Sequence, residues 1–339
     1  MLRPGDMQSA RSAPLPGGAP FVLERRPLPS VRKALARDAR RGLAARSKSL
    51  PPKYLYDERG SRLFDEICDL PEYYLTRTET DLLTRHARDI IDTANPATLI
   101  ELGAGTSRKT RLLLRAATAA RVDLVYVPID VCEEVLRESG AELVREFPRL
   151  RVQALVADYE RDVRHLPDGP RRLVAFLGST IGNPPPAHTR RFLKRLADGL
   201  RPGEHLLLGA DLVKPVERLE AAYNDSAGVT AEFNRNVLRV LNRELDGNFP
   251  ADAFEHVAFF DRRKSRIEMH LRARKPLRAR LKAIDLDVAL RAGETIHTEV
   301  SRKFTVDRLD HTLAAAGFET VRWYLPNDSS YALILAERV

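Results

Sequence analysis

The chain has 339 residues, more than the ~100–200 of an ordinary domain, so it can bury a large core in one large domain or two intertwined ones. Hydrophobic residues make up 43% and charged residues 30%, which is ordinary for a soluble enzyme and excludes a disordered or fibrous chain. The formal net charge of +9 makes nucleic acid a candidate partner.

The basic residues, however, are spread thinly along the chain. Clusters occur at residues 25–46, at Arg171 and Arg172, and at residues 262–275. Few aromatic residues alternate with these clusters, as a stacking platform for single-stranded bases would require. We therefore interpret the clusters as solvated arginine-rich faces and expect no nucleic acid partner.

The sequence also lacks the marks of a membrane or disulfide-rich protein. No apolar run approaches the ~20 residues that cross a bilayer, and the N-terminus lacks the apolar segment of a signal peptide. We expect a cytoplasmic protein without membrane contact. Cys68 and Cys132 lie in separate segments without a CxxC or His-rich neighbour, which indicates neither a disulfide framework nor a zinc site.

Three segments with different patterns precede the regular part of the chain. Residues 1–20 are rich in Pro, Gly, Ser and Arg without periodicity, which predicts a disordered leader. Val31 to Ala45 shows apolar residues at helical spacing among Arg and Lys, which predicts a basic helix. Residues 49–94 then predict two short helical stretches around a proline-containing, tyrosine-rich loop that we expect to cover a site.

Between Leu99 and Val213, short apolar runs alternate with helical segments. The runs are TLIELGAG, VDLVYVPID, LRVQALVAD, RLVAFLGST and HLLLGADLV. Buried strands alternating with helices predict an α/β fold, a parallel Rossmann-like sheet with helices on both faces. Ligands of such sheets bind beyond the carboxyl ends of the strands.

The first run ends in Glu101-Leu-Gly-Ala-Gly-Thr, whose glycines allow unusual backbone angles and close approach of a ligand. A nicotinamide-binding loop would carry a third glycine where Arg108 stands, which argues against a dehydrogenase. No Walker lysine-serine pair follows, so a phosphate-cradling loop is not indicated either.

Acidic residues follow the next two runs. Asp130 comes 27 residues after Gly103 and can accept both hydroxyls of a ribose. Asp158 and Tyr159 end the third run, where they can receive an exocyclic adenine amine. Alone, Asp130 could be an ordinary helix N-cap. The combination predicts a pocket for S-adenosylmethionine.

The fourth run ends in GSTIGNPPP, residues 178–186, at the edge that would face the reactive methyl group. Asn183 is therefore a candidate for gripping a substrate. Asn-Pro-Pro also resembles the Asn-Pro-Pro-aromatic motif of enzymes that methylate adenine or glutamine amide nitrogens. Here the fourth residue is Pro186, so the aromatic platform is missing.

Several longer segments resemble the histidine Nα-methyltransferase family of ergothioneine biosynthesis. The resemblance covers the chain from about Lys48 to the C-terminus. It is carried by YLYDERGSRLFDEICDLPEYYLTRTE, ELGAGTSRKT, FLGSTIGN, LLLGADLVK, AYNDSAGVTAEFNRNVL, DAFEHVAFF, RIEMHLRAR and TEVSRKF.

The resemblance implies a second domain, formed by the N-terminal segment and an insertion after the fifth strand, that closes over histidine. After the leader, residues 21–77 and 214–303 would form this substrate-binding domain. Residues 78–213 and 304–339 would form the methyltransferase domain. A monomer is expected, with S-adenosylmethionine as methyl donor, L-histidine as substrate and no metal.

Carried over position by position, the resemblance also implies site residues. Those contacting S-adenosylmethionine would be Gly103, Lys109, Asp130, Asp158 and Tyr159. Those surrounding histidine would be Tyr56, Tyr73, Asn183, Tyr223, Met269, Glu299 and Ser301. The departures from the family are the longer N-terminus and Tyr159, where the family often carries phenylalanine.

These residue types suit trimethylation of the α-amine of histidine to hercynine. Asn183 and Tyr223 are neutral donors for the carboxylate, Glu299 can accept the imidazole N–H, and Ser301 can donate to or accept from the other ring nitrogen. We expect Tyr56, through water or directly, to orient the amine and, with Asn183, to act in catalysis. The rings of Tyr56 and Tyr73 could hold the cationic product by cation–π attraction.

Other interpretations remain open at this point. The tyrosines could be cover residues, Met269 core filler, and the face shared by Glu299 and Ser301 merely solvated. The substrate could be another amino acid such as a tryptophan-like one, or a nucleic-acid or protein amide. A cofactor-binding regulatory module without turnover is a third class.

Overall fold

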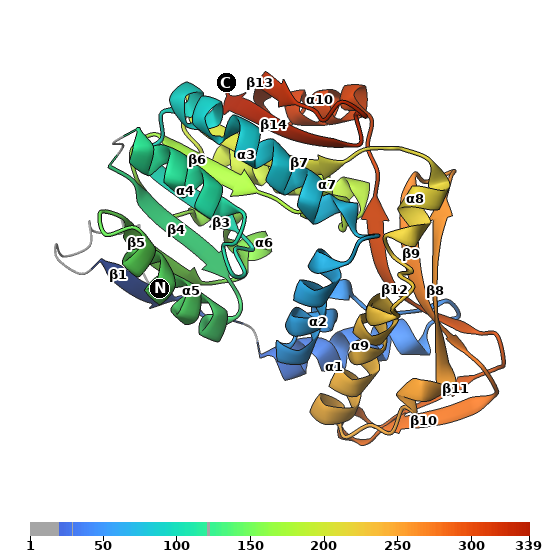
Figure 1. Cartoon of the computed structure of the whole chain (residues 1–339). Coiled ribbons are helices and arrows are strands. Elements are labelled where there is room, and N and C mark those ends of the chain that lie inside the picture. The colour runs from blue at the N-terminus through green and yellow to red at the C-terminus, as the bar shows by residue number, and fades with distance from the viewer. Residues whose placement is uncertain (1–19, 29, 121–122) are drawn as a thin grey trace, which may run out of the picture.

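The computed structural model describes residues 20–28, 30–120 and 123–339, so the predicted leader lies outside it except for its last residue. Figure 1 shows two units: a large sheet flanked by helices at upper left, and a smaller unit at lower right. Within the described ranges, no helix is long and apolar enough to cross a membrane.

Eight strands form the large sheet, and the first six across it run parallel. β14 is antiparallel to both of its neighbours. All residues of β3 and β6 are buried, as expected for apolar strands at the centre of a parallel sheet. The five predicted strands and the α/β class are confirmed. From edge to edge the strands are β1 (Phe21–Arg25), β5 (Arg151–Val156), β4 (Val125–Asp130), β3 (Thr98–Leu102), β6 (Arg172–Phe176), β7 (His205–Asp211), β14 (Tyr331–Arg338) and β13 (Phe318–Tyr324).

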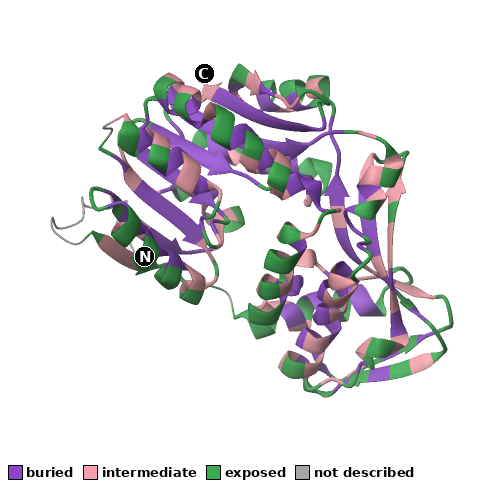
Figure 2. Ribbon diagram, viewed as in Figure 1, coloured by how far each residue is buried: buried purple, intermediate pink, exposed green. Residues whose placement is uncertain are grey.

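Successive residues of a strand point to opposite sides, and both faces of this sheet are apolar, so helices cover both. Leu99 belongs to the core under α3 (Tyr74–Ala94), α4 (Thr110–Ala119) and α5 (Glu133–Glu146). Its neighbour Ile100 belongs to the core under α7 (Pro186–Asp198) and α10 (Val306–Ala314). Figure 2 shows the strands buried and the outer helix faces exposed. Shorter turns after β5 and β6 are α6 (Tyr159–Asp162), η2 (Val163–His165) and η3 (Thr180–Gly182).

The smaller unit is built from the segment between β1 and α3 and the segment between β7 and α10. Its sheet has the order β2 (Lys48–Ser49), β12 (Thr295–Arg302), β9 (Arg266–Ala273) and β8 (Phe254–Asp261). A separate hairpin joins β10 (Leu277–Leu281) and β11 (Leu286–Leu290). Its helices are α1 (Val31–Ala44), α2 (Glu58–Asp69), α8 (Val216–Ala221) and α9 (Val229–Leu245), with the turns η1 (Pro52–Leu55), η4 (Ala251–Ala253) and η5 (Lys282–Ile284). The predicted basic helix is thus present as α1.

The structure differs from the predicted division of the chain at two places. Residues 21–25, assigned to the substrate-binding domain, form β1 and pair in parallel with β5 at the edge of the large sheet. A strand of only five residues does not reveal from its sequence which sheet edge it will join. The predicted boundary between residues 77 and 78 falls inside α3, which already begins at Tyr74. The joins at 213/214 and 303/304 do follow β7 and β12.

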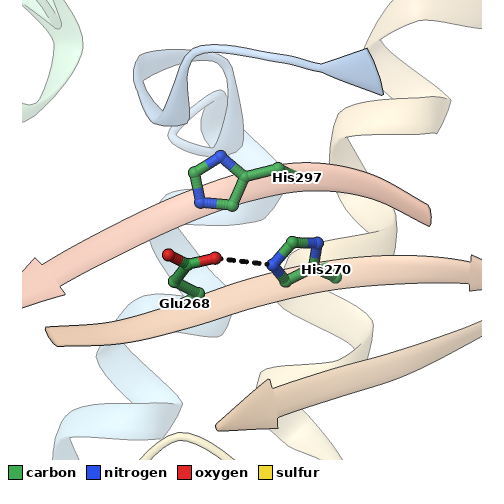
Figure 3. A group of neighbouring side chains, drawn as sticks. All are labelled: Glu268, His270 and His297. Carbon is green, nitrogen blue, oxygen red and sulfur yellow. Dashed lines mark hydrogen bonds and ion pairs between the residues drawn. The ribbon is translucent and has the colours of Figure 1, made fainter. Parts of the chain in front are cut away.

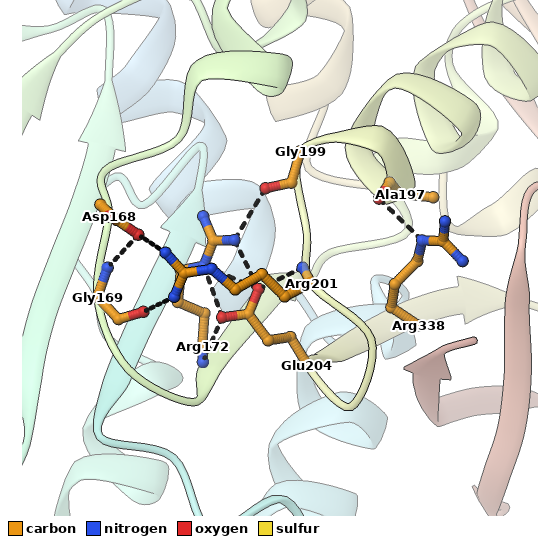
Figure 4. Close-up of polar contacts among 8 residues, drawn as sticks. All are labelled: Asp168, Gly169, Arg172, Ala197, Gly199, Arg201, Glu204 and Arg338. Atoms are coloured by element: carbon orange, nitrogen blue, oxygen red, sulfur yellow. Dashed lines mark hydrogen bonds and ion pairs between the residues drawn. The ribbon is translucent and has the colours of Figure 1, made fainter. Parts of the chain in front are cut away.

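A buried ion pair lies at the amino ends of β6 and β7 (Figure 4). Arg172 and Glu204 are each about 5% exposed, and Arg172 Nε donates to Glu204 Oε1 at 2.9 Å. Arg172 also donates to the carbonyl of Gly199 at 2.9 Å, while Glu204 accepts the backbone N–H of Arg201 at 2.7 Å. The interpretation of Arg172 as part of a solvated face is therefore wrong, because Glu204 compensates its charge inside the protein.

Candidate active site

The loop after β3 carries two glycines with positive φ, +69° at Gly103 and +49° at Gly105. Glycine adopts this left-handed region at little cost. The N–H of Gly105 donates to Asp130 Oδ2 at 2.9 Å, which ties the loop to the end of β4. A Cβ on Gly103 would lie 3.5 Å from Cε1 of Tyr159. The loop therefore lies between the residues predicted to contact the ribose and the adenine.

The two aspartates after β4 and β5 differ in their local roles. Asp130 also accepts the N–H of Cys132 at 3.0 Å. The N-cap of α5 is Cys132 itself, so the alternative interpretation of Asp130 as an ordinary helix N-cap is wrong. Asp158 does cap α6 by accepting the N–H of Glu160 at 3.0 Å. Tyr159 beside it packs edge-on against Phe176, with ring centroids 5.6 Å apart.

Lys109 forms an ion pair with a buried carboxylate, a contact that the sequence analysis missed. Its ammonium pairs with Glu79 of α3, whose side chain is fully buried. Glu79 also accepts the N–H of Gly178 at 2.9 Å and the hydroxyl of Tyr331 at 2.7 Å. Burial alone would lower the pKa of Lys109, but Glu79 outweighs it and raises that pKa. Lys109 thereby joins the glycine loop to the loop after β6.

A signal for Glu79 exists in the sequence. It lies four residues after Leu75 and three before Leu82, so it falls on the apolar face of α3. A carboxylate on such a face needs a buried partner. The pattern indicates that a partner exists, but it does not identify Lys109.

A cavity lies where segments of the two units meet, and all seven residues predicted to surround the substrate line it. They are Tyr56, Tyr73, Asn183, Tyr223, Met269, Glu299 and Ser301. The sequence analysis missed the other half of the lining. These residues are Phe64, Ile67, Gly178, Thr180, Ala222, Thr230 and Phe233.

The strand register explains how β9 and β12 contribute to the cavity. Met269 lies directly opposite Glu299, and Ser301 follows two residues later on the same face. Glu299 is 7% exposed and Ser301 4%, so the interpretation of this face as solvated is wrong. Met269 is 1% exposed and belongs to the same apolar core as the buried residues of α9. It also lines the cavity, so it is both a core residue and a lining residue.

Aromatic rings form one wall of the cavity. Tyr56 ends the turn η1, and its ring meets Phe233 edge-on at 5.2 Å between centroids. Tyr73 precedes α3, and its ring meets Tyr223 edge-on at 6.1 Å. Edge-to-face pairs hold rings in fixed orientations, and ring faces attract cations. The wall is therefore suited to a cationic group.

Glu299 is the carboxyl group of the cavity. Burial raises its pKa to about 7, although the nearby Lys303 ammonium opposes this shift. Near neutral pH the group therefore exists in both protonation states, and its ionised form can accept an N–H from a ligand. Burial raises the pKa of Tyr73 well above its usual value, which keeps that residue a neutral phenol.

A second network of buried charges lies behind the cavity wall. Asp211 ends β7 with its side chain fully buried, and it accepts from Lys303 Nζ at 2.7 Å and from the hydroxyl of Tyr74 at 2.7 Å. Lys214 also pairs with Asp211. Lys303 Nζ donates further to two cavity residues, Ser301 and Tyr223. The sequence analysis missed Asp211 and Lys303, although Lys303 continues the alternation of residues 299 and 301.

Another group of side chains lies on the opposite face of β9 and β12 (Figure 3). The ligand-type atoms of Glu268, His270 and His297 lie within 4.8 Å of one another. Glu268 already accepts from Arg266 Nε at 2.8 Å and contacts His270 Nε2 at 3.1 Å. Burial lowers the pKa of His297 to about 4, so this imidazole is neutral at pH 7. The group lies outside the cavity lining.

Comparisons with known proteins show the family to which the chain belongs. The family described as "Histidine-specific methyltransferase, SAM-dependent" matches residues 35–338. Histidine N-alpha-methyltransferase of Mycolicibacterium smegmatis is 50% identical over 91% of this chain and 96% of that protein. The protein of the same name from Mycobacterium tuberculosis is 47% identical over 90% and 95%. Ergothioneine biosynthesis protein 1 of Neurospora crassa is 31% identical over 86% of this chain and 34% of that protein.

Proposed function

The chain belongs to the histidine-specific, S-adenosylmethionine-dependent methyltransferases, and from this premise we propose that it transfers three methyl groups to the α-amine of L-histidine. In this proposal the product is hercynine and the reaction is the first step of ergothioneine biosynthesis, which is in keeping with the similarity to ergothioneine biosynthesis protein 1 of Neurospora crassa. The cavity is the observation that carries the proposal. All seven residues predicted to surround histidine line it, although they come from segments far apart in the chain.

The cavity offers a different group to each part of histidine. We assign the imidazole N–H to ionised Glu299, with Ser301 facing the other ring nitrogen. We assign the substrate carboxylate to the amide of Asn183, which lies after β6 at the edge where the glycine loop also ends. A site built on such polar pairing rejects analogues that leave its groups unpaired, by ~10⁴-fold in favourable cases.

The methyl donor is assigned to the carboxyl ends of β3, β4 and β5. Gly103, Asp130, Asp158 and Tyr159 converge there, with Lys109 anchored below them by Glu79. This arrangement supports the proposed ribose and adenine contacts, because the carboxylates stand at the strand ends and the glycine loop has room for close approach.

The transfer needs a neutral amine aligned with the methyl carbon and sulfur. The amine first loses a proton, its nitrogen lone pair then bonds to the methyl carbon, and the carbon–sulfur bond breaks to release S-adenosylhomocysteine. Three rounds release three protons and leave a quaternary ammonium. Tyr56 is our candidate for orienting the amine, and alignment alone can supply several kcal/mol of rate enhancement.

Mass spectrometry of the protein incubated with S-adenosylmethionine and an equimolar mixture of the common amino acids tests the proposal. Histidine alone should gain three methyl groups. Glu299→Ala should abolish this gain while binding of S-adenosylhomocysteine persists. Methylation of tryptophan or of added RNA, with histidine unmodified, would contradict the substrate assignment and leave the cofactor assignment standing.

The cytoplasmic location, the monomeric state and the lack of a nucleic acid partner stay predictions. Cell fractionation tests the first of these. Light scattering of the purified protein tests the second, and the salt dependence of any RNA binding tests the third.

A further inference from the structure

Three side chains with metal-ligand atoms gather on the face of β9 and β12 that is turned away from the cavity. Glu268 and His270 belong to β9, and His297 belongs to β12. Figure 3 shows both imidazole rings turned toward the carboxylate of Glu268. The ligand-type atoms of the three residues all lie within 4.8 Å of one another. The proposed function uses none of these side chains.

An irregularity in β12 brings His297 to this face. Residues two apart on a strand normally face the same side, so regular alternation would place His297 with Glu299 in the cavity. The register between the strands shifts at this point, because His297 pairs with His270 whereas Glu299 pairs with Met269. Bulges of this kind re-aim side chains. The rings of His297 and His270 therefore lie side by side, with centroids 4.8 Å apart.

The ring of His297 has a nitrogen that the protein does not use. Its Nε2 atom is buried and has no hydrogen-bond partner among the described residues. Buried polar atoms normally have a partner, since leaving one without a bond costs free energy. Figure 3 shows this side of the ring directed at Glu268. The unpartnered nitrogen therefore points into the group of ligand-type atoms.

The carboxylate of Glu268 also keeps one oxygen available. Its cationic neighbours approach Oε1, with Arg266 Nε at 2.8 Å and Lys264 Nζ at 3.7 Å. The other oxygen, Oε2, contacts His270 Nε2 at 3.1 Å. A carboxylate oxygen has two lone pairs, so Oε2 can bind a further ligand while Oε1 keeps its ion pairs.

We propose that Glu268, His270 and His297 bind one divalent transition-metal ion, for which Zn²⁺ is the probe, and that this ion links β9 to β12. Two imidazoles and a carboxylate form a known ligand set for Zn²⁺, with water in the fourth position. The ion supplies the partner that His297 Nε2 lacks. The inference does not rest on the proposed function, because methyl transfer is expected to need no metal and the group lies outside the cavity lining.

The spacing of the group is close to that around a bound ion. Bonds of about 2.1 Å in a tetrahedron hold the ligand atoms about 3.4 Å apart. Glu268 Oε2 and His270 Nε2 are already 3.1 Å apart. His297 then has to approach by roughly 1.4 Å or less, which a rotation of its side chain provides. Phe259 stacks on the ring of His270 at 5.5 Å between centroids and limits its rotation.

The ligand types and the nearby charges set the expected selectivity and affinity. Mg²⁺ and Ca²⁺ prefer oxygen ligands, whereas imidazole nitrogens favour Zn²⁺ and its transition-metal neighbours. The positive charges of Arg266 and Lys264 oppose a cation, so we expect a Kd of about 10 µM for Zn²⁺ rather than the much tighter binding of closed structural sites.

Isothermal titration of the tag-free protein with Zn²⁺ tests the proposal. Histidine is left out because it binds Zn²⁺ itself. One ion per chain should bind, and an excess of Mg²⁺ should not displace it. His297→Phe keeps a ring of similar size and loses no hydrogen bond at Nε2, and it should weaken binding by about 10-fold or more.

His311→Phe is the matched control, since it makes the same substitution at an exposed histidine of α10. Its Kd for Zn²⁺ should stay within about twofold of that of the unchanged protein. Equal binding by His297→Phe and the unchanged protein would overturn the inference, as would a lack of Zn²⁺ binding by the unchanged protein. If His297→Phe fails to fold, Glu268→Gln replaces it and should also weaken binding by about 10-fold or more.

Two further variants test the place of the ion. Glu299→Gln removes the carboxylate of the cavity, and Cys68→Ser removes a partly buried thiol. Both should bind Zn²⁺ within about twofold of the unchanged protein. A loss of binding in either variant would place the ion elsewhere and overturn the inference.

The link between the strands has its own measurement. An ion that binds only the folded chain raises its melting temperature. Zn²⁺ at ten times its Kd should raise the Tm of the unchanged protein by about 2 °C or more, and that of His297→Phe by less than about 1 °C. Equal shifts in the two proteins would show that Zn²⁺ does not act through this group.

Discussion

Two buried ion pairs stand at opposite ends of the strands in the large sheet. Arg172 and Glu204 lie at the amino ends of β6 and β7, where their remaining bonds go to backbone groups of neighbouring loops. Asp211 and Lys303 lie at the carboxyl end of β7, where two of the three ammonium protons go to hydroxyls of the cavity lining.

The difference shows that a buried charge does not by itself indicate a function. Both pairs are compensated, as buried charges must be. What separates them is the destination of the remaining hydrogen bonds. At the amino end these bonds fix the chain, and at the carboxyl end they fix side chains that face a ligand. We therefore expect substitutions at the first pair to change stability and those around the second to change activity.

The largest effect should come from Glu299→Ala. In the proposed site, loss of the carboxylate leaves the imidazole N–H of histidine without its acceptor, so kcat/KM for histidine should fall by about 10⁴-fold. Steady-state kinetics measures this, and the Kd of S-adenosylhomocysteine should stay within about threefold as a control. If cofactor binding fell as much as activity, the substitution would not act through the substrate alone, and the expected link between this end of the sheet and activity would be contradicted.

The next effect concerns the amino-end pair. Glu204→Ala leaves Arg172 as a buried charge without a counterion, so the free energy of unfolding should fall by about 3–5 kcal/mol. Urea denaturation measures this loss. The activity per folded molecule should remain within about twofold at a temperature where the variant is folded. A catalytic defect in fully folded Glu204→Ala would contradict the division between the two ends.

Glu299 should make the free energy of unfolding depend on pH. Its pKa of about 7 in the folded protein lies above the ordinary value of 4.5, so the folded state holds the proton more tightly than the unfolded state. The contribution of Glu299 to stability should therefore decline as pH rises from about 4.5 to 7, and Glu299→Gln should lack this contribution.

The predicted difference between the two proteins follows from the size of that shift. Glu299→Gln should have a free energy of unfolding close to that of the unchanged protein at pH 4 and about 3 kcal/mol higher at pH 8. Urea titrations at a series of pH values measure it. If the free energy of unfolding depended on pH in the same way in both proteins, the pKa of Glu299 would not be raised in the folded state.

The smallest effect should come from Tyr159→Phe, at the border of the proposed cofactor site. The edge-on packing against Phe176 needs only the ring, so the Kd of S-adenosylmethionine should change less than about threefold. Tyr159→Ala removes the ring and should weaken binding by about 10-fold. Isothermal titration measures both. A large loss in Tyr159→Phe would instead assign the hydroxyl a direct contact.

Much of the central sheet could be predicted from the sequence because its strands are short apolar runs that end in glycine or acidic residues. TLIELGAG and VDLVYVPID each combine a buried strand with the residues that follow its carboxyl end. The substrate set came from the family resemblance rather than from periodicity. Pattern alone supports Asn183 and Asp130, because their positions follow from the strands before them.

The buried partners could not be predicted in the same way. Glu79 and Lys303 are charged residues, which a sequence pattern places on the surface by default. Their burial depends on Lys109 and Asp211, which lie 30 and 92 residues away along the chain. Likewise, the pairing of β1 with β5 joins residues more than 100 positions apart. Long-range complementarity of this kind becomes visible only in the folded chain.

β1 also has a consequence for the behaviour of the molecule in solution. A Cβ on Gly140 of α5 would lie 2.2 Å from Cε2 of Phe21, so the glycine leaves the space in which the ring of β1 packs. Arg25 at the other end of the strand bonds to Glu133 at 2.7 Å. Without β1, the outer edge of β5 would present unpaired N–H and C=O groups to any passing strand. β1 takes that edge position instead, and because it has only five residues and carries Glu24 and Arg25, it is a poor template for pairing with another chain. Trimming it would therefore lower solubility before it affected the chemistry.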